Sequence, residues 1–409
     1  MPARPRVPAH LIGRELERHH RHRDDSTTVS GHHNDNLVVR LSPALTRAAG
    51  EPDGLLGTFR TPRKTVQVVP RMWRDEAEVL TAVHPYLAEV PRYLGRAGDT
   101  ALYTYVEGAP LSARAPRGTA LGDRTLVRMA SIFGQLSTVP EEALPPRPAG
   151  WPADGDSAGF LEALVTFTEK HVHQANEPDF GRLFKAVGIP PEAMETFREQ
   201  ARSLAPRPFG LLHTDLHRDN LIETPGGGIA VIDWEIALYG DPLHDLATHL
   251  VRMAYTDRER ELLVELWRGQ MARRGHRARL AGMKTDLELY VDFELAQSVY
   301  ADTLRAALSL PPRAGGARLR AALDRAARDV RRALTRARGP LRVLDPVSVD
   351  DIREALHDWY AEHAPAVLHP EPAAAPVPAG AAVTAGAAVT AGAAVARPTG
   401  VEQPPTARR

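Results

Sequence analysis

The chain has 409 residues, and its 51 basic and 51 acidic side chains give a formal net charge of +0 at pH 7. This balance argues against a protein built mainly to coat nucleic acid or an anionic membrane. A hydrophobic content of 43% supplies enough apolar surface for a sizeable core, and the length predicts two or three folded units. Because there is no cysteine, disulfides, thiol nucleophiles and cysteine-ligated metal centres are excluded.

The two ends differ in composition from the middle. Residues 1–24 are rich in arginine and histidine and contain no apolar run of signal-peptide length, so we expect a flexible leader or a short helix, and no secretory signal. Residues 364–409 are rich in alanine, proline and glycine and repeat the hexamer Ala-Gly-Ala-Ala-Val-Thr, which predicts a disordered tail. Neither end resembles a membrane span, and we expect a cytoplasmic protein.

Between the ends, the elements fall into two parts. Residues 25–108 predict a β-rich lobe with one helix at 74–83 and strands at 27–30, 36–41, 57–61, 66–73 and 101–106. Residues 109–363 predict a helical lobe with helices near 125–138, 158–174, 191–204, 243–254, 258–274, 285–309, 317–336 and 349–361. The fold class is therefore α+β, with a small β-rich N-lobe and a larger helical C-lobe.

Residues 209–235, FGLLHTDLHRDNLIETPGGGIAVIDWE, carry the most chemical information. Asp215 enters a polar loop, Asn220 opens an apolar run, a glycine turn follows, and Asp233 ends the next apolar run. A hairpin folded symmetrically about this turn places Asn220 opposite Asp233, where two oxygen donors can share Mg²⁺. Asp215 can then accept the proton of an attacking hydroxyl, while His213 braces the loop.

These residues resemble a known superfamily. The pattern from His213 to Asn220, followed by Ile-Asp-Trp-Glu at 232–235 and Gly-Asp-Pro-Leu-His-Asp-Leu-Ala at 240–247, is similar to the aminoglycoside phosphotransferase/choline kinase superfamily, over roughly residues 27–310. The resemblance implies a protein-kinase-like fold, Asp215 as catalytic base, and Asn220 and Asp233 as metal ligands. It also implies that Asp245 supports the catalytic loop.

The N-lobe carries a weaker form of the same pattern. Residues 30–36, which include Asn34, resemble the family's loop over the nucleotide phosphates, and Tyr105 and Val106 resemble its adenine-lining hinge. The basic residue that anchors the phosphates is left open among three candidates, with Arg71 favoured slightly over Arg60 and with Lys64 third. The partner of that basic residue on the helix is Glu76, with Glu78 as the competitor.

The predicted function is an ATP- and Mg²⁺-dependent transfer of the γ-phosphate to a hydroxyl of a small molecule, with GTP as the alternative donor. The acceptor is open, and Asp286, Glu288, Asp292 and Glu294 would suit a cationic aminoglycoside or amino sugar unless they form a solvated helix face. The alternatives are a peptide serine/threonine kinase of the same fold and a nucleotide-binding pseudokinase. No nucleic-acid or membrane partner is expected, and the sequence leaves the oligomeric state open.

Overall fold

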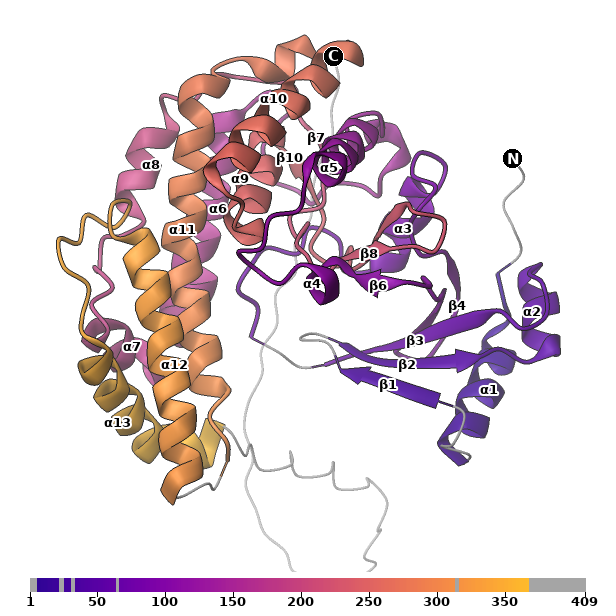
Figure 1. Ribbon diagram of the computed structural model, residues 1–409, viewed down its shortest axis with the longest axis horizontal. Helices are drawn as coiled ribbons and strands as arrows, with labels where there is room; N and C mark the ends of the chain where they lie inside the picture. The colour runs from indigo at the N-terminus through magenta and orange to yellow at the C-terminus, as the bar shows by residue number, and fades with distance from the viewer. Residues whose placement is uncertain (1–5, 22–25, 31–33, 64–65, 313–315, 368–409) are drawn as a thin grey trace, which may run out of the picture.

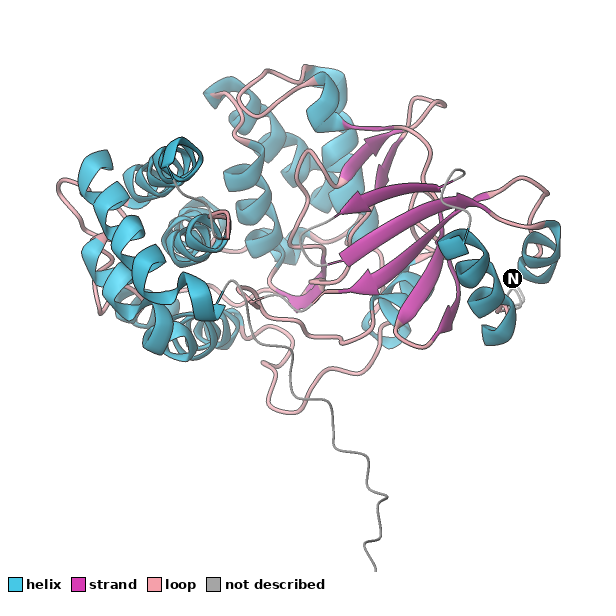
Figure 2. Ribbon diagram, turned by 90° about the horizontal axis from the view of Figure 1, so that it is seen from below, coloured by secondary structure: helices cyan, strands magenta, loops and turns pink. Residues whose placement is uncertain are grey.

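The computed structural model describes residues 6–21, 26–30, 34–63, 66–312 and 316–367. These residues form two lobes, a small one built on an antiparallel sheet and a larger one that is mostly helical (Figure 1). Figure 2 shows the helices of the large lobe gathered on one side and the sheet on the other. The predicted α+β two-lobed fold class is confirmed. Most of the predicted tail, from residue 368 onward, lies outside the described residues.

The small lobe is organised around a five-stranded antiparallel sheet in the order β1-β2-β3-β5-β4. Successive side chains of a strand point to opposite faces, and β5 shows what each face covers. Leu102 packs into a small core with helices α1 and α2, whereas Ala101 and Tyr103 join the main core beneath α3. The elements of this lobe are α1 (Ala9–Arg21), β1 (Ser26–Ser30), β2 (Asn34–Arg40), α2 (Pro43–Ala49), β3 (Leu56–Pro62), α3 (Glu76–Val83), β4 (Tyr93–Ala97) and β5 (Thr100–Thr104).

Of the two forms expected for the leader, Ala9–Arg21 takes the helical one and forms helix α1, so this stretch is not flexible chain. Ile12 of this helix is fully buried, and the main-chain N–H of Val7 donates to Leu94 O of β4 at 2.8 Å. The apolar residues that bury α1 are separated by arginine and histidine, so composition alone conceals a helix with one apolar face.

The predicted strand at 66–73 is also wrong. Residues 66–73 form no strand, while β4, which the sequence reading missed, completes the sheet. Pro70 lacks the N–H that a ladder needs, and the apolar residues of the segment are buried against the large lobe instead. The indole N–H of Trp73 donates to Pro145 O at 3.0 Å, which ties this segment to the helical lobe.

The large lobe packs around the long helix α11, which lies against α9 and α12. Short strands form a β10-β7 pair and a β6-β8-β9 sheet. The strands of this lobe are β6 (Ala109–Pro110), β7 (Gly210–Leu212), β8 (Leu221–Glu223), β9 (Ile229–Val231) and β10 (Leu238–Gly240). Its α-helices are α4 (Leu111–Arg114), α5 (Asp123–Leu136), α6 (Ser157–Phe167), α7 (Glu177–Ala186), α8 (Glu195–Ala201), α9 (Pro242–Met253), α10 (Asp257–Arg273), α11 (Met283–Leu308), α12 (Gly316–Ala337) and α13 (Val349–Val367).

Helix α9 begins at a well-defined cap and is buried along almost its whole length. The side chain of Asp241 accepts from Leu243 N, and Pro242 occupies the first turn, where its missing N–H costs nothing. Asp241 also pairs with the buried Arg207 at 2.6 Å, which compensates the buried carboxylate. The Gly-Asp-Pro segment therefore fixes where α9 starts and how it lies against the loop that begins at His213.

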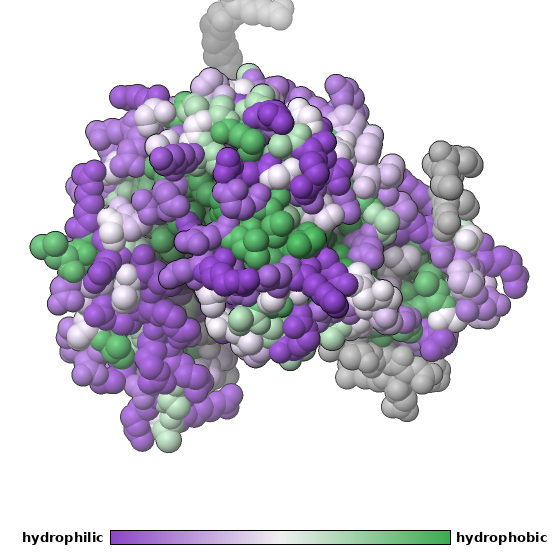
Figure 3. Space-filling view, turned by 45° about the horizontal axis from the view of Figure 1, so that its top comes forward, coloured by the Kyte–Doolittle hydropathy of each residue, from purple (hydrophilic) through white to green (hydrophobic). Residues whose placement is uncertain are grey.

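The surface in Figure 3 is mainly hydrophilic, with hydrophobic residues in small groups. Among the helices of the described ranges, none combines the length and the apolar content needed to cross a bilayer.

Candidate active site

The hairpin predicted from the glycine turn is present, one residue out of the expected register. Strands β8 and β9 pair with Leu221 opposite Val231, and the N–H of Ile232 donates to Asn220 O at 3.0 Å. The prediction that Asn220 faces Asp233 is therefore wrong by one position, because the turn is centred on Gly226 rather than between two glycines. In a regular ladder, this shift would send the Asp233 side chain to the other face.

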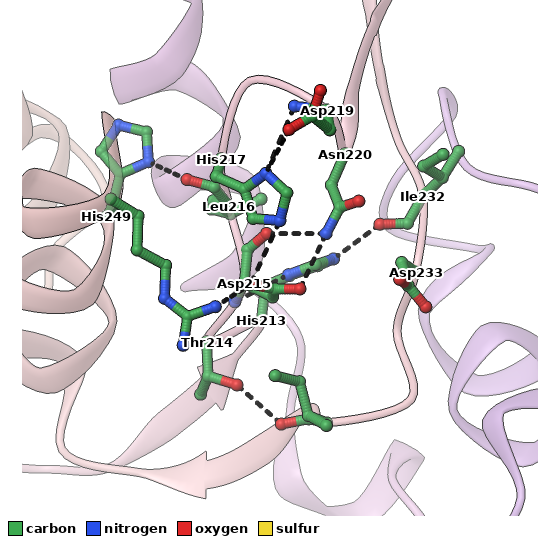
Figure 4. Close-up of polar contacts among 12 residues, drawn as sticks. His213, Thr214, Asp215, Leu216, His217, Asp219, Asn220, Ile232, Asp233 and His249 are labelled. Atoms are coloured by element: carbon green, nitrogen blue, oxygen red, sulfur yellow. Dashed lines mark hydrogen bonds and ion pairs between the residues drawn. The ribbon is translucent and has the colours of Figure 1, made fainter. Parts of the chain in front are cut away.

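At Asp233 the backbone departs from the β-ladder, and this brings the Asp233 side chain back to the side on which Asn220 lies. Its φ of 67° lies in the left-handed region, which is uncommon for a residue other than glycine and clusters at functional sites. Asn220 and Asp233 consequently line the same cavity. The amide Nδ2 of Asn220 donates to Asp215 Oδ2 at 2.9 Å and to Asp215 O at 3.0 Å, which turns its oxygen toward the Asp233 side (Figure 4).

Asp215 is held from several sides and is only 15% exposed. Besides the Asn220 amide, its carboxylate contacts the Arg252 guanidinium and lies 3.4 Å from His217 Nε2. Burial alone would raise the pKa of Asp215, but the charge of Arg252 and the contact with His217 lower it below its ordinary value. The carboxylate is therefore ionised and fixed in orientation, as a group that positions a hydroxyl requires.

The loop around Asp215 is anchored by buried groups. Asp245 of α9 accepts from the main-chain N–H of His213 at 3.1 Å and from that of Thr214 at 2.7 Å. Burial raises the pKa of Asp245 to about 6, against the lowering effect of these two donors. His213 Nδ1 accepts from Asp215 N at 3.2 Å, and its Nε2 lies 3.1 Å from Ile232 O. Since burial lowers the pKa of His213 to about 4, its ring is neutral and fastens the two strands of the site.

On the N-lobe side, the ion pairs differ from the favoured assignment. Arg60 of β3 pairs with Glu76 of α3 at 2.7 Å, and its other nitrogen lies 2.8 Å from Asp233 Oδ1. Arg71 pairs instead with Glu235 at 3.0 Å. The preference for Arg71 as the partner of Glu76 is therefore wrong: Arg60 sits on a central strand of the sheet and points at the helix, whereas Arg71 lies on the connector beyond it.

The other N-lobe candidates have different positions. Asn34 opens β2 and donates to Glu235 Oε2 at 3.0 Å, which brings the start of that strand to the cavity side of the large lobe. Tyr105 and Val106 follow β5 at the connection between the lobes, where Tyr105 N donates to Leu56 O at 3.0 Å. Lys64 and residues 31–33 of the predicted phosphate loop lie outside the described residues.

One cavity of about 590 Å³ brings the chemically important residues together. Asp215, Asn220 and Asp233 line it from the large lobe, and Val68 and Val69 line it from the connector of the small lobe. The predicted catalytic and metal-binding residues thus share one cavity, whereas Glu76 reaches it indirectly, through Arg60 and Asp233.

The oxygen donors at this site fit a magnesium ion that is shared with a phosphate ligand. The Asn220 oxygen is turned toward the Asp233 side, and both are hard oxygen ligands of the type that Mg²⁺ takes in few numbers, with phosphates and waters completing its shell. Within the described ranges, no group of three or more His, Asp or Glu side chains forms a metal cluster.

The acids on α11 do not form the surface that a polycation would need. Asp286 is buried against Arg207, and Glu288 pairs with Arg260 at 2.8 Å on the surface. Glu294 alone among the four predicted acids lines the cavity, and it is buried and lies 3.2 Å from Arg252. The four acids therefore form neither a single acidic acceptor site nor a single solvated helix face.

The sequence reading missed Arg252, which contacts Asp215 and belongs to the core of the site. Arg252 follows Asp245 by seven residues, which is two helical turns, so both side chains lie on the face of α9 beneath the catalytic loop. That spacing of seven residues was the sequence feature from which Arg252 could have been predicted. Glu235, which faces Arg71 and Asn34, was visible only as the end of the Ile-Asp-Trp-Glu motif.

Comparison with known proteins agrees with the motifs. The model of the phosphotransferase enzyme family matches residues 32–282, and this chain belongs to that family. The chain is thus a phosphotransferase, and the resemblance to the aminoglycoside phosphotransferase/choline kinase superfamily is confirmed. A search of the curated proteins gave no match.

Several solved structures are similar in fold. Macrolide 2'-phosphotransferase MphH from Brachybacterium faecium is 20% identical, with a TM-score of 0.47, over 77% of this chain and 97% of that one. An ethanolamine kinase from Plasmodium vivax is 11% identical, with a TM-score of 0.48, over 82% and 81% of the two chains. A choline/ethanolamine kinase family protein from Mesorhizobium loti is 16% identical, with a TM-score of 0.47, over 82% and 92%.

Proposed function

We propose that this phosphotransferase moves the γ-phosphoryl group of ATP to a hydroxyl of a small molecule and uses Mg²⁺ to do so. The observation that carries the proposal is that Asp215, Asn220 and Asp233 line one cavity, although Asp233 is separated from the loop by a complete hairpin. A carboxylate that orients a hydroxyl and two hard oxygen ligands are the parts that phosphoryl transfer requires.

Each residue has a physical task in this proposal. Asn220 and Asp233 hold the metal, which, when bound, neutralises the charge of the phosphates. Arg60 reaches both Glu76 and Asp233, so its guanidinium lies where it can bind a phosphate oxygen as well. Asp215 accepts a hydrogen bond from the acceptor hydroxyl and takes its proton as the bond from that oxygen to the γ-phosphorus forms, while the bond from the γ-phosphorus to the bridging oxygen breaks and ADP leaves.

The lowered pKa of Asp215 suits this task. A carboxylate of low pKa is a weak base. In a loose phosphoryl-transfer transition state, however, the proton leaves the hydroxyl late, so the carboxylate mainly has to orient that hydroxyl. Asn220 and Arg252 each bind one carboxylate oxygen and thereby supply that orientation.

The test is an assay of phosphate transfer from ATP over a panel of small-molecule alcohols, with and without Mg²⁺. The proposal predicts metal-dependent transfer to at least one alcohol and tight nucleotide binding only when Mg²⁺ is present. GTP in place of ATP tests the donor, and a serine-containing peptide tests the alternative acceptor. Nucleotide binding that is indifferent to metal, together with no transfer to any acceptor, would contradict the proposal.

A further inference from the structure

The cavity continues past the catalytic loop to a second end that the proposed phosphoryl transfer does not use. This end lies where α11 packs between α9 and α12 (Figure 1), close to the segment that follows α4. Its charged lining residues are Arg117, Arg252, Glu294, Asp302, Arg305 and Arg336. We call these six residues the acceptor end.

The charges at the acceptor end are not balanced. Two of its four arginines have acidic partners within the cavity: Arg252 contacts Asp215 and Glu294, and Arg305 lies 3.3 Å from Asp302. Both acids of this end are therefore already paired. A cationic acceptor at this end would therefore lie against arginine side chains, because the two carboxylates are already paired.

The remaining two arginines converge on one atom. The guanidinium of Arg336 donates to the main-chain oxygen of Val251 at 2.8 Å, and that of Arg117 reaches the same oxygen at 3.4 Å. Within the residues that the structure describes, neither forms an ion pair with a carboxylate. Both side chains are exposed where they line the cavity, and burial of part of the Arg336 guanidinium and the charge of Arg117 lower the pKa of Arg336 against the opposing effect of Asp302 and Glu294. An anion placed between the two guanidinium groups would offset their mutual repulsion.

The location of this pair connects it to the chemistry. Val251 directly precedes Arg252, whose side chain contacts Asp215. An acceptor bound at the pair thus lies along the last turn of α9, with its other end directed toward the catalytic carboxylate. The planar fork of arginine matches the oxygens of a carboxylate or a phosphate, and a neutral sugar or an ammonium group gains nothing comparable from it.

We propose that the acceptor is an alcohol that carries an anionic group, a carboxylate or a phosphate, and that Arg117 and Arg336 bind that group. This inference rests on the proposed function, because it assigns the acceptor of the same site. It departs from the cationic acceptor that the acids of α11 suggested, since only one of those acids lines the cavity and it is paired.

The experiment begins with acceptors that differ only in charge. Glucose, glucuronate, glucose 6-phosphate and glucosamine share one ring and present a neutral, a carboxylate, a phosphate and a cationic form. Glycerol, glycerate, glycerol phosphate and choline form a smaller set. For each, phosphate transfer from MgATP and inhibition of the basal ATP hydrolysis are measured with the full chain, and MgATP affinity is measured separately by calorimetry.

Variants then assign the effect to the two arginines. In each of the single variants Arg117→Gln and Arg336→Gln, we expect the KM or the inhibition constant of the anionic member to rise about 10-fold, because each variant removes a hydrogen bond to a charged group. In the double variant, we expect a rise of about 100-fold. The constants for the neutral member and for MgATP stay unchanged. Arg328→Gln is the matched control, because it changes an exposed arginine of α12 that does not line the cavity.

The outcomes separate the two proposals. Preference for an anionic member, lost in the double variant and kept in the control, supports the inference, and comparison of carboxylate with phosphate identifies the group. A preference for neutral or cationic members overturns it, as does a panel in which no anionic member is phosphorylated or inhibits ATP hydrolysis. Absence of Mg²⁺-dependent nucleotide binding would instead overturn the proposed function itself, and the inference with it.

Discussion

The two walls that meet at the catalytic cavity are held together in different ways. On the large-lobe side, main-chain groups of the catalytic loop bind buried side chains, as when Asp245 accepts from two successive N–H groups. On the small-lobe side, ion pairs between side chains predominate, such as Arg60 with Glu76 and Arg71 with Glu235, although Glu76 also accepts from the main-chain N–H of Trp234 at 2.8 Å. The first arrangement fixes main-chain atoms of the loop in place, whereas an ion pair between side chains can exchange one charged partner for another.

This difference predicts that the two walls contribute to different steps of the reaction. Changes on the large-lobe wall should act on the chemical step, because they alter groups that contact the reacting atoms. Changes on the small-lobe wall should act mainly on nucleotide binding, because side-chain ion pairs can be replaced by contacts with phosphates.

The largest effect is expected for Asp215→Asn. The amide keeps the shape of the side chain but cannot take the proton of the acceptor hydroxyl, so kcat should fall about 100- to 10,000-fold. Arg252 keeps its contact with Glu294, so the fold and its melting temperature should be retained. Turnover close to that of the unchanged protein would show that Asp215 is not the base, and it would contradict the expectation that the large-lobe wall acts on the chemical step.

Asp233→Asn should act on the metal. With the charge removed, the dissociation constant of ATP measured with Mg²⁺ should rise about 10- to 100-fold, since a charged contact is lost. Binding of ATP without metal should change little. Calorimetry with and without Mg²⁺ measures both, and Asp99→Asn, at an exposed carboxylate that does not line the cavity, is the control. Equal weakening with and without metal would contradict the assignment.

The small-lobe wall is tested by a paired substitution. Arg60→Gln should raise the KM for ATP about 10-fold, because this guanidinium reaches Asp233 and can contact phosphate, whereas Arg71→Gln should have a smaller effect. Both should change kcat less than Asp215→Asn does. If Arg71→Gln proved the more damaging, the phosphate-anchoring role would move back to the residue that the sequence favoured.

The smallest effect concerns stability rather than catalysis. Burial lowers the pKa of His244 to about 3, so the unfolded chain binds a proton below pH 6.5 that the folded chain does not. The free energy of unfolding should therefore decrease as the pH falls from about 6.5 toward 4, by up to about 1.4 kcal/mol per pH unit for this residue. Phe160, Tyr290 and Phe293 surround the ring.

His244→Phe should reduce that slope by about one proton, measured by urea unfolding at several pH values. His84→Phe places the same side chain at an exposed position and serves as the control. An unchanged slope in His244→Phe would show that the buried histidine does not contribute.

The division between the walls also explains what could be predicted from the sequence. The spacing of Asp215, Asn220 and Asp233 was readable because a loop and a hairpin of adjacent residues bring them together. The register was wrong by one residue because three successive glycines do not fix the centre of a turn. The left-handed backbone of Asp233, which compensates for that shift, leaves no mark in the sequence.

The small-lobe wall could not be predicted to the same depth. The choice between Arg60 and Arg71 depends on which residues lie on β3, and the apolar segment at 66–73 imitates a strand although it packs on the large lobe. Arg117 and Arg336 are more than 200 residues apart in the chain and meet only because the end of α12 comes within reach of Val251 in α9. Contacts of this kind depend on tertiary packing, which local spacing does not encode.

The most direct test of the central claim is a crystal structure of the protein with Mg²⁺ and a non-hydrolysable ATP analogue. We predict a metal ion about 2.1 Å from the oxygens of Asn220 and Asp233, with the terminal phosphate facing Asp215 across the cavity. A metal bound elsewhere, or a terminal phosphate remote from Asp215, would contradict the account.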